Sequence, residues 1–379
     1  MSISTLDSLL VDLPLAAYTT AASNHSVGIY KMKMLLIALS ANLLITCSVG
    51  AASTDIDRVA EVIKEGRLGE IRAVIVEQGG EVLYEQYFNG FDAQQRHDIR
   101  SAGKSITALA LGRAIGDGLI PSVDEKPLAE LGAPESYSGI SVRDLLTMTS
   151  ALECNDWDSE SPGQEDRMYS KRAWTPHALN IPLEDDYSRG RDGFGRFSYC
   201  TAGIFLLGRY VSERSGDSFD TYVQAKLLDP LGISDVEWTR SPAGEVQAGG
   251  QIEMRPRDLV RIGRLVLDGG AYGGQQLVSE AWIEEMLTPY TRATDSDDFG
   301  YLWWLRAYRA GEFATPGWYM LGNGGTTVVV FEALDAVVVV AAANFNQPGM
   351  HQFARDIIER GALPLLLDRG LGEKRIGHP

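Results

Sequence analysis

A serine and a lysine three residues apart, Ser101 and Lys104, stand near the start of the segment "HDIRSAGKSITALALGRAIGDGLI", residues 97–120. If this segment is helical, residues i and i+3 share a face, so the hydroxyl and the amine can meet. A serine hydroxyl is a weak nucleophile until a base removes its proton, and burial favours the neutral amine of a lysine. The pair therefore predicts a nucleophile and its base without a histidine. N–H groups at the helix N-terminus would favour a developing oxyanion.

The same spacing also arises when a serine caps a helix and the lysine is solvated, so the pair depends on its context. Residues 71–88 predict two strands around a Gly79-Gly80 turn, because glycines tolerate the positive φ of a tight hairpin. Residues 101–117 predict a helix that stops at Gly118. The candidate nucleophile therefore follows a β-hairpin and opens a helix.

The remaining segments predict helices in the middle of the chain and strands towards its end. Ser141 and Asp144 form a capping pair at the start of another helix. The acidic, Pro- and Gly-containing stretch 153–196 predicts a long loop, and loops of that length are often functional. Further helices are expected over 201–213, 217–228, 255–270, 279–289 (capped by Ser279) and 350–361, and β-rich runs over 299–308, 326–334 and 336–345.

This order predicts an α/β (α+β) fold in which one antiparallel sheet is built from both ends of the chain and is flanked by helices. The last two β-rich runs are expected to pair around Asp335. We expect the sheet region over 57–120 and 246–379, and an inserted, mostly helical region over 121–245 that carries the 153–196 loop.

The segment around Ser101 resembles the active-site helix of the serine β-lactamase and penicillin-binding-protein superfamily. It is most similar to the class C-like branch, which includes esterases, D-amino-acid peptidases and amide-oligomer hydrolases. The segments "DLLTMTSAL", "FSYCTAGIFLLGRYVSERSG" and "MRPRDLVRIGRLVLDGG" are similar to that branch in order and spacing. The resemblance covers about residues 57–360 and implies a β-lactamase/DD-peptidase-like fold with Ser101 as the nucleophile and Lys104 as its base.

The second motif of that superfamily is Tyr-x-Asn or Tyr-x-Ser, and Tyr199-Cys200-Thr201 stands in its place. The resemblance implies that the Tyr199 phenol relays a proton between nucleophile, lysine and leaving group. A tyrosine before a helix is by itself more often a packing residue. Thr201 keeps a hydrogen-bonding group at the third position but lacks the amide of asparagine.

The third motif, usually Lys-Thr-Gly or His-x-Gly on a strand that faces the serine, is altered in "LGNGGTTVVV", residues 321–330. Asn323 stands where the cation would be, which argues against β-lactam and D-Ala-D-Ala recognition and favours esters or uncharged amides. Gly324 and Gly325 keep small residues where substrate would approach, and the N–H near Thr326 is the expected second oxyanion donor. Without the resemblance, "GNGG" is simply a turn entering a strand.

The N-terminus has the features of a secretory signal: Lys31 and Lys33, then the apolar run 34–46, then small residues. We expect residues 1–33 to lie outside the fold or to precede the true start, residues 34–52 to form the signal peptide, and cleavage to fall near Ala51 or Ala52. The protein would then be periplasmic or secreted. Lipid attachment at Cys47 and a retained hydrophobic helix are the alternatives, and only lipidation would make the membrane a partner.

Export would leave two cysteines, Cys154 and Cys200, which either pair in an oxidising compartment or stay as buried thiols. A disulfide would fasten the 153–196 loop beside Tyr199. Trp157 and Tyr169 in that loop are candidate pocket walls, although each could equally be ordinary loop packing.

Composition narrows the possible partners. The 379 residues carry a net charge of −17, which argues against nucleic acid or an anionic membrane surface as a partner. The five histidines have no metal-ligand spacing, and "DSDDFG" (295–300) lacks the glutamate of a calcium loop, so no metal or cofactor is expected.

The sequence therefore predicts a serine hydrolase acting on a small-molecule ester, amide or peptide. A D,D-peptidase or β-lactamase, and a non-catalytic penicillin-binding-like sensor domain, remain as alternatives.

Overall fold

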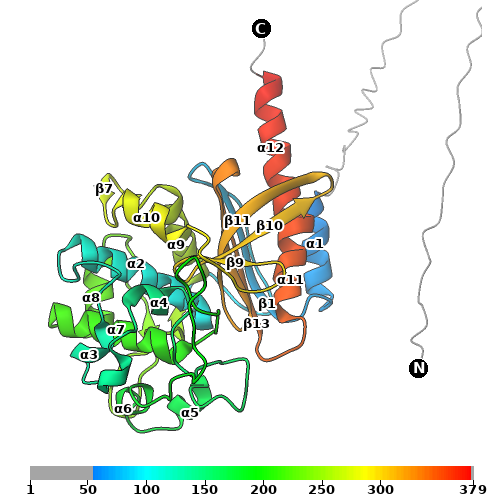
Figure 1. Cartoon of the computed structure of the whole chain (residues 1–379). Helices are drawn as coiled ribbons and strands as arrows, with labels where there is room; N and C mark the ends of the chain where they lie inside the picture. The colour runs from blue at the N-terminus through cyan, green and yellow to red at the C-terminus, as the bar shows by residue number, and fades with distance from the viewer. Residues whose placement is uncertain (1–53, 377–379) are drawn as a thin grey trace, which may run out of the picture. The chain divides into compact units, whose positions relative to one another are not determined.

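The computed structural model describes residues 54–376, and their main feature is an eight-stranded antiparallel sheet (Figure 1). The strand order is β2-β1-β13-β12-β11-β10-β9-β8. The strands span β1 Ile71–Gln78, β2 Glu81–Tyr87, β8 Thr291–Arg292, β9 Asp298–Phe299, β10 Trp304–Ala310, β11 Phe313–Leu321, β12 Gly324–Phe331 and β13 Ala336–Asn344. The first strand, β1, therefore lies between β2 and the last strand, β13, so the sheet is built from both ends of the chain.

The middle of the sheet is buried on both faces. Strands β1, β12 and β13 are nearly continuous apolar runs, "IRAVIVEQ", "GGTTVVVF" and "AVVVVAAAN", and every residue of β12 is buried. β-Branched valines suit such strands because their stiff side chains pack well on a pleated surface.

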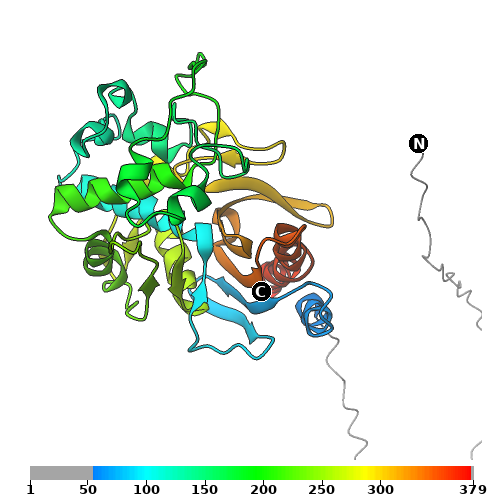
Figure 2. The same cartoon turned by 90° about the horizontal axis from the view of Figure 1, so that it is seen from below.

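Helices cover both faces of the sheet (Figures 1 and 2). Helix α9 (Pro256–Leu267) packs on β12, β13 and β1, whereas α11 (Met350–Ile357) packs on β12 and β13 from the opposite side, next to α1 (Asp55–Lys64) and α12 (Leu363–Ile376). The other helices are α2 Gly103–Gly116, α3 Pro127–Glu130, α4 Val142–Leu146, α5 Glu165–Tyr169, α6 Thr175–Ala178, α7 Thr201–Ser215, α8 Phe219–Val223 and α10 Glu280–Met286.

Helix α2, which is rich in small and apolar residues, is surrounded by other helices. It packs against α7 and α10, and eleven of its residues, Lys104 among them, are buried. Gly112 is required by this packing, because a Cβ there would lie 2.2 Å from Cδ1 of Trp282 on α10. A single turn of 3-10 helix, Arg100–Ala102, precedes α2 and carries Ser101.

Two small sheets complete the fold. Strands β3 (His97–Asp98), β5 (Ile252–Met254) and β4 (Glu237–Trp238) form a three-stranded sheet directly before the Ser101 turn. Strands β6 (Ala271–Tyr272) and β7 (Gln275–Gln276) form a hairpin after α9.

The local predictions are confirmed where sequence signals are strong. The 71–88 hairpin turns at Gly79 and Gly80, both at positive φ, and β12 pairs with β13 across Asp335. The reciprocal Ser141–Asp144 cap is present, and Ser279 caps α10.

Other boundaries differ from the predictions. Strand β11 was not predicted, because Pro316 and Gly317 weaken the strand pattern of "FATPGWYML". The 153–196 loop contains the short helices α5 and α6, and the final helix continues through a π-helical turn, Ile358–Ala362, into α12.

The predicted signal segment 34–52, its cleavage site and Cys47 lie outside the described residues. Within residues 54–376, no helix combines the length and apolarity needed to cross a membrane.

Candidate active site

Ser101 and Lys104 meet at the start of α2. The Nζ atom of Lys104 lies 2.9 Å from Oγ of Ser101, at hydrogen-bond distance. The lysine side chain is buried, with 2% of the residue exposed, whereas Ser101 is only partly buried and faces a cavity. The arrangement places an amine behind a hydroxyl that substrate can still reach.

Tyr199 lies close to this pair. It directly precedes Cys200, the N-cap residue of α7. Nζ of Lys104 lies 4.9 Å from the centre of the Tyr199 ring. Burial raises the pKa of the Tyr199 phenol, although the Lys104 charge and hydrogen bonding with Ser101 act in the opposite direction. The structure therefore brings the three residues of the predicted catalytic group together from two distant segments.

Two tryptophans enclose Tyr199. Trp157, from the long loop, stacks on the Tyr199 ring at 5.4 Å between centroids, and Trp304 of β10 lies 5.9 Å away on a tilted plane. Trp157 is nevertheless 58% exposed, so it forms the outer rim of the site. Trp157 was a candidate pocket wall from the sequence, whereas Trp304 was not.

These residues line one cavity of about 330 Å³. It extends from Ser101 along β10 and β11 to α11. Its lining consists of Ser101, Asp156, Trp157, Glu165, Tyr199, Thr294, Asp297, Trp304, Arg306, Tyr308, Tyr319, Leu321, Gly322, Asn323, Thr327, Met350, His351, Arg355 and Ile358.

Of the four third-motif residues singled out from the sequence (Asn323, Gly324, Gly325 and Thr326), Asn323 lines this cavity and the other three do not. Its side chain is already engaged, because Nδ2 donates to Oδ1 of Asn346 and Oδ1 accepts from the Asn346 N–H. The backbone N–H of Asn323 donates no hydrogen bond to any residue of 54–376.

Gly324, Gly325 and Thr326 lie behind the cavity wall. A Cβ on Gly325 would come within 2.3 Å of the Met350 carbonyl oxygen, so close packing explains why a glycine is needed at this position. The Thr326 hydroxyl donates to the Ala342 carbonyl and lies 2.7 Å from Nε2 of His97. Burial lowers the pKa of His97 to about 3, so its ring is neutral and fixes β3 to β12 beside Ser101.

An acidic residue that the sequence analysis did not select, Asp156, holds the Tyr199 segment. Its N–H donates to the Tyr199 carbonyl at 2.8 Å, and its Oδ2 accepts from the Thr201 N–H at 2.7 Å. Burial and the nearby Glu165 raise the pKa of Asp156 to about 6, although Lys104 and Thr201 oppose the rise. Thr201 itself is fully buried and does not line the cavity.

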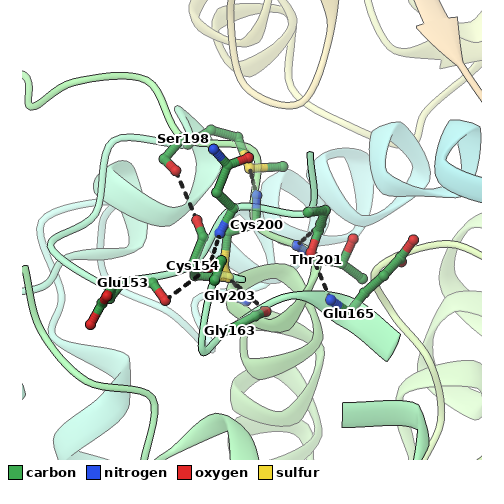
Figure 3. Close-up of a disulfide and its surroundings, with 12 residues drawn as sticks. Glu153, Cys154, Gly163, Glu165, Ser198, Cys200, Thr201 and Gly203 are labelled. Carbon is green, nitrogen blue, oxygen red and sulfur yellow. Dashed lines mark hydrogen bonds between the residues drawn. A yellow bond between two sulfur atoms is a disulfide. The ribbon is translucent and has the colours of Figure 1, made fainter. Parts of the chain in front are cut away.

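A disulfide joins Cys154 to Cys200 next to these contacts (Figure 3). Together with the Asp156 hydrogen bonds it fastens the start of the long loop to the segment that carries Tyr199. Tyr169 is not a wall of the cavity: its hydroxyl donates to Glu165 and accepts from Gln247, and so it supports the lining from behind.

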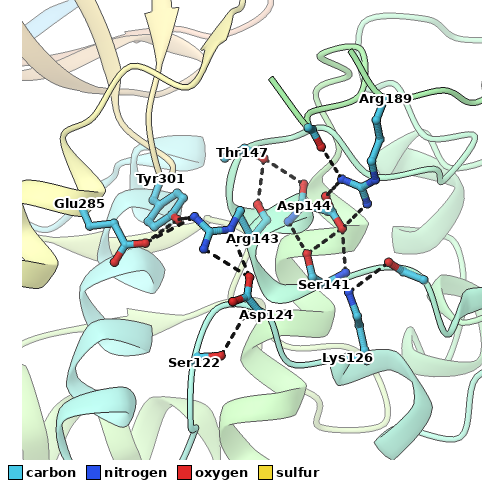
Figure 4. A network of polar contacts seen from close by, with 12 residues as sticks. Ser122, Asp124, Lys126, Ser141, Arg143, Asp144, Thr147, Arg189, Glu285 and Tyr301 are labelled. Atoms are coloured by element: carbon cyan, nitrogen blue, oxygen red, sulfur yellow. Dashed lines mark hydrogen bonds and ion pairs between the residues drawn. The ribbon is translucent and has the colours of Figure 1, made fainter. Parts of the chain in front are cut away.

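The far part of the loop is fixed as well (Figure 4). Arg189 donates two hydrogen bonds, at 2.6 and 2.8 Å, to the buried carboxylate of Asp144, which also caps α4. The Tyr187 hydroxyl donates to the Thr149 carbonyl. The 153–196 loop is therefore held to the rest of the protein at both its start and its far part.

Among the described residues, no group of three or more His, Cys, Asp or Glu side chains is arranged to hold a metal ion. What the site offers is a hydroxyl nucleophile, a neighbouring amine, a phenol and backbone N–H groups. These are the components of acyl transfer through a covalent intermediate.

Comparison with known protein families gives one family match. The family model described as Beta-lactamase matches residues 72–363 of the chain. The chain belongs to the beta-lactamase family.

The chain is similar in sequence to the 6-aminohexanoate-dimer hydrolase of Paenarthrobacter ureafaciens, with 32% identity over 265 residues. The match covers 66% of this chain and spans 64% of the length of that relative.

Solved structures of the beta-lactamase fold are also similar. The octameric penicillin-binding protein homologue from Pyrococcus abyssi has a TM-score of 0.64 at 19% identity, over 83% of this chain and 78% of the other. The D-amino acid amidase from Ochrobactrum anthropi SV3 has a TM-score of 0.61 at 16% identity, over 85% and 100%. At these identities the likeness establishes the fold, which confirms the predicted fold class.

Proposed function

We propose that this beta-lactamase family member is a serine hydrolase that forms an acyl-enzyme on Ser101 and hydrolyses an amide or ester of a small molecule or peptide. The observation that carries the proposal is the 2.9 Å approach of Lys104 Nζ to Ser101 Oγ in a site where the lysine is buried. The relative that is named for hydrolysis of an amide dimer supports the same reaction class.

In the proposed first step, Lys104 in its amine form accepts the Ser101 proton while Oγ attacks the substrate carbonyl carbon. The carbonyl oxygen becomes an oxyanion, and the Ser101 N–H is one donor to it. The family resemblance implied a second donor near Thr326. We assign it instead to the unengaged N–H of Asn323, because Asn323 lines the cavity and Thr326 does not.

Tyr199 then passes a proton to the leaving amine or alkoxide as the bond to the carbonyl carbon breaks. Water attacks the acyl-Ser101 ester in the second half of the cycle, and its proton returns along the same groups. The acid product leaves, and Ser101 is restored.

Amides and esters are favoured over β-lactams, because the cation position of the third motif holds Asn323, whose amide is bound to Asn346. We also propose that the protein is exported. Its disulfide supports an oxidising compartment, together with the signal-like residues 34–52.

The proposal is tested with p-nitrophenyl esters and matched p-nitroanilides. Ser101→Ala should lower kcat/KM by at least about 10³-fold, and Lys104→Met and Tyr199→Phe by about 10²–10⁴-fold. A fluorophosphonate should add its mass to the peptide that contains Ser101.

No turnover and no adduct in the folded wild type would favour the sensor alternative instead. Efficient nitrocefin hydrolysis would overturn the preference against β-lactams.

A further inference from the structure

The cavity does not end at the catalytic group. Its lining also includes Tyr308 and Tyr319 of the β10–β11 hairpin and His351 and Arg355 of α11, and we call this part of the cavity the distal compartment. The ring of Trp304 lies 5.9 Å from that of Tyr199 and 6.3 Å from that of Tyr319. These aromatic faces form a continuous wall that would suit an extended apolar chain.

Arg306 of β10 stands at the end of this wall, with its guanidinium carbon 5.2 Å from the centre of the Tyr319 ring. Its Nε donates to Oδ1 of Asp297 at 2.6 Å, and Nη2 lies equally close to the same oxygen. Nη1 has no hydrogen-bond partner within residues 54–376. Asp297 thus orients the guanidinium and leaves one of its edges available.

The carboxylate of Asp297 makes several other contacts. Besides Arg306 it accepts hydrogen bonds from Thr294, Ser296 and Tyr319. Burial opposes its charge, but Arg306 and these hydroxyls lower the pKa of Asp297 to about 2. Asp297 lines the same cavity, but its carboxylate oxygens already accept these hydrogen bonds, whereas Nη1 of Arg306 is available to a ligand.

A second guanidinium reaches the same compartment from α11. Nε of Arg355 donates to Glu359 at 3.2 Å, whereas its two Nη atoms have no partner in the described chain. His351, one turn earlier on α11, also lines the compartment, and its buried Nδ1 is unpartnered. Burial and the charge of Arg306 lower the pKa of His351, so its ring is a neutral hydrogen-bonding group.

We propose that Arg306 and Arg355 form a subsite for a carboxylate group of the substrate, remote from the scissile bond and joined to it by an apolar chain along Trp304 and Tyr319. Planar guanidinium groups match carboxylate geometry better than an ammonium does. The subsite rests on the proposed hydrolase function, and it supplies from β10 and α11 the positive charge that Asn323 does not provide.

The test compares kcat/KM within two matched substrate pairs. The first pair is p-nitrophenyl hydrogen adipate against p-nitrophenyl hexanoate, with the carboxylate on the acyl side. The second is N-hexanoyl-6-aminohexanoate against N-hexylhexanamide, with the carboxylate on the leaving-group side. The wild type should prefer the anionic member of at least one pair by tenfold or more.

Arg355→Gln should remove most of that preference, which is measured as the ratio of kcat/KM for the anionic member to kcat/KM for the neutral member. Arg306→Lys keeps a positive charge beside Asp297, so the fold is retained. It should also weaken the preference, because an ammonium lacks the planar set of N–H donors of the guanidinium. Arg360→Gln is the matched control, since Arg360 is largely exposed in the same helical segment and lies outside the cavity.

Turnover of neutral substrates with no anionic preference in either pair would overturn the subsite and leave the proposed function intact. A preference that Arg355→Gln and Arg306→Lys both leave unchanged would also overturn it. No turnover of any of the four substrates, together with no fluorophosphonate adduct at Ser101, would overturn the hydrolase function and the subsite with it.

Discussion

At the scale of single residues, Asp156 both holds the Tyr199 segment in place and has a perturbed pKa. Its carboxylate and N–H bracket Tyr199 and Thr201 through two hydrogen bonds, and its charge lies near that of Lys104. A buried acid that holds a catalytic segment in place should leave a trace in the pH dependence of stability.

The pKa of Asp156 is raised to about 6 in the folded state, above the value of 3.8 for an unperturbed aspartate. The folded state therefore binds this proton more tightly than the unfolded state. The contribution of Asp156 to stability is greatest below about pH 4 and is lost as the pH rises through about 6. Asp156→Asn should thus gain stability relative to wild type between pH 4 and pH 7, by up to about 3 kcal/mol.

Urea unfolding at several pH values measures this difference. Asp186→Asn, an exposed position in the same loop, serves as the control and should follow the wild-type curve. Parallel curves for wild type and Asp156→Asn would show that the carboxyl group does not titrate in this window.

At the scale of elements, the α2 helix is positioned by small residues. Gly112 lets α10 approach, and the Trp282 indole N–H then donates to the Ala108 carbonyl at 3.1 Å. Gly116, one turn later on α2, has no atom within 4 Å of the place where a Cβ would stand. Gly112 and Gly116 of the same helix therefore differ in what a methyl group would meet.

Gly112→Ala should destabilise the protein by about 1–3 kcal/mol, because the indole ring must move away from α2. Gly116→Ala should instead be neutral or stabilising by about 0.5 kcal/mol through helix propensity. Thermal and urea unfolding of both variants measure the contrast. Equal effects at the two positions would contradict the packing argument.

The second element is the 153–196 loop, whose start is joined to the Tyr199 segment by the Cys154–Cys200 disulfide. Reduction, or replacement of both cysteines by serine, should cost about 2–4 kcal/mol of stability. It should also lower kcat several-fold or more even well below the melting temperature, because Asp156 and Tyr199 would be held less closely.

Activity assays with and without a phosphine reductant measure this effect, and the double serine variant controls for effects of the reductant elsewhere. An unchanged kcat in the reduced wild type, at a temperature where it stays folded, would show that the disulfide has no influence on the catalytic group.

At the scale of the whole molecule, a buried ion pair joins α9 to the sheet. Nη2 of Arg264 donates to both carboxylate oxygens of Glu77 on β1, at 2.8 and 2.6 Å, and Arg264 also contacts Asp335 between β12 and β13. Only 4% of the Glu77 side chain is exposed. The pair therefore ties an early strand, a middle helix and a late turn to one point.

Arg264→Met should destabilise the protein by about 3–5 kcal/mol, since it leaves the Glu77 carboxylate buried without its partner. The double variant Glu77→Gln/Arg264→Met should recover part of this loss, because the uncompensated charge is gone. Urea unfolding of the single and double variants decides the point, and a double variant no more stable than Arg264→Met would contradict it.

The elements that the sequence predicted are those with local signals. The Gly79-Gly80 turn, the Ser141–Asp144 cap and the valine-rich runs each act within a few residues, so their structures follow from the chain itself. Strand β11 was missed because its pairing with β10 and β12 overrides the weak pattern around Pro316.

The candidate site divides in the same way. The spacing of Ser101 and Lys104 lies within one helical turn, and the family resemblance added Tyr199. Asp156, Trp304 and Arg306 were not selected, because nothing near them in the sequence marks them as neighbours of Ser101. The disulfide was one of two open possibilities.

By itself, the sequence determined the helix that carries Lys104 next to Ser101, the 71–88 hairpin and the valine-rich strands β12 and β13, and the membership of the superfamily, since these depend on spacing and on hydrophobic pattern. The tertiary structure alone decided what surrounds the nucleophile. The loop, the β10–β11 hairpin and α11 meet there only because sheet register and helix packing bring them together, and contacts between segments so far apart in the chain have no counterpart in local sequence.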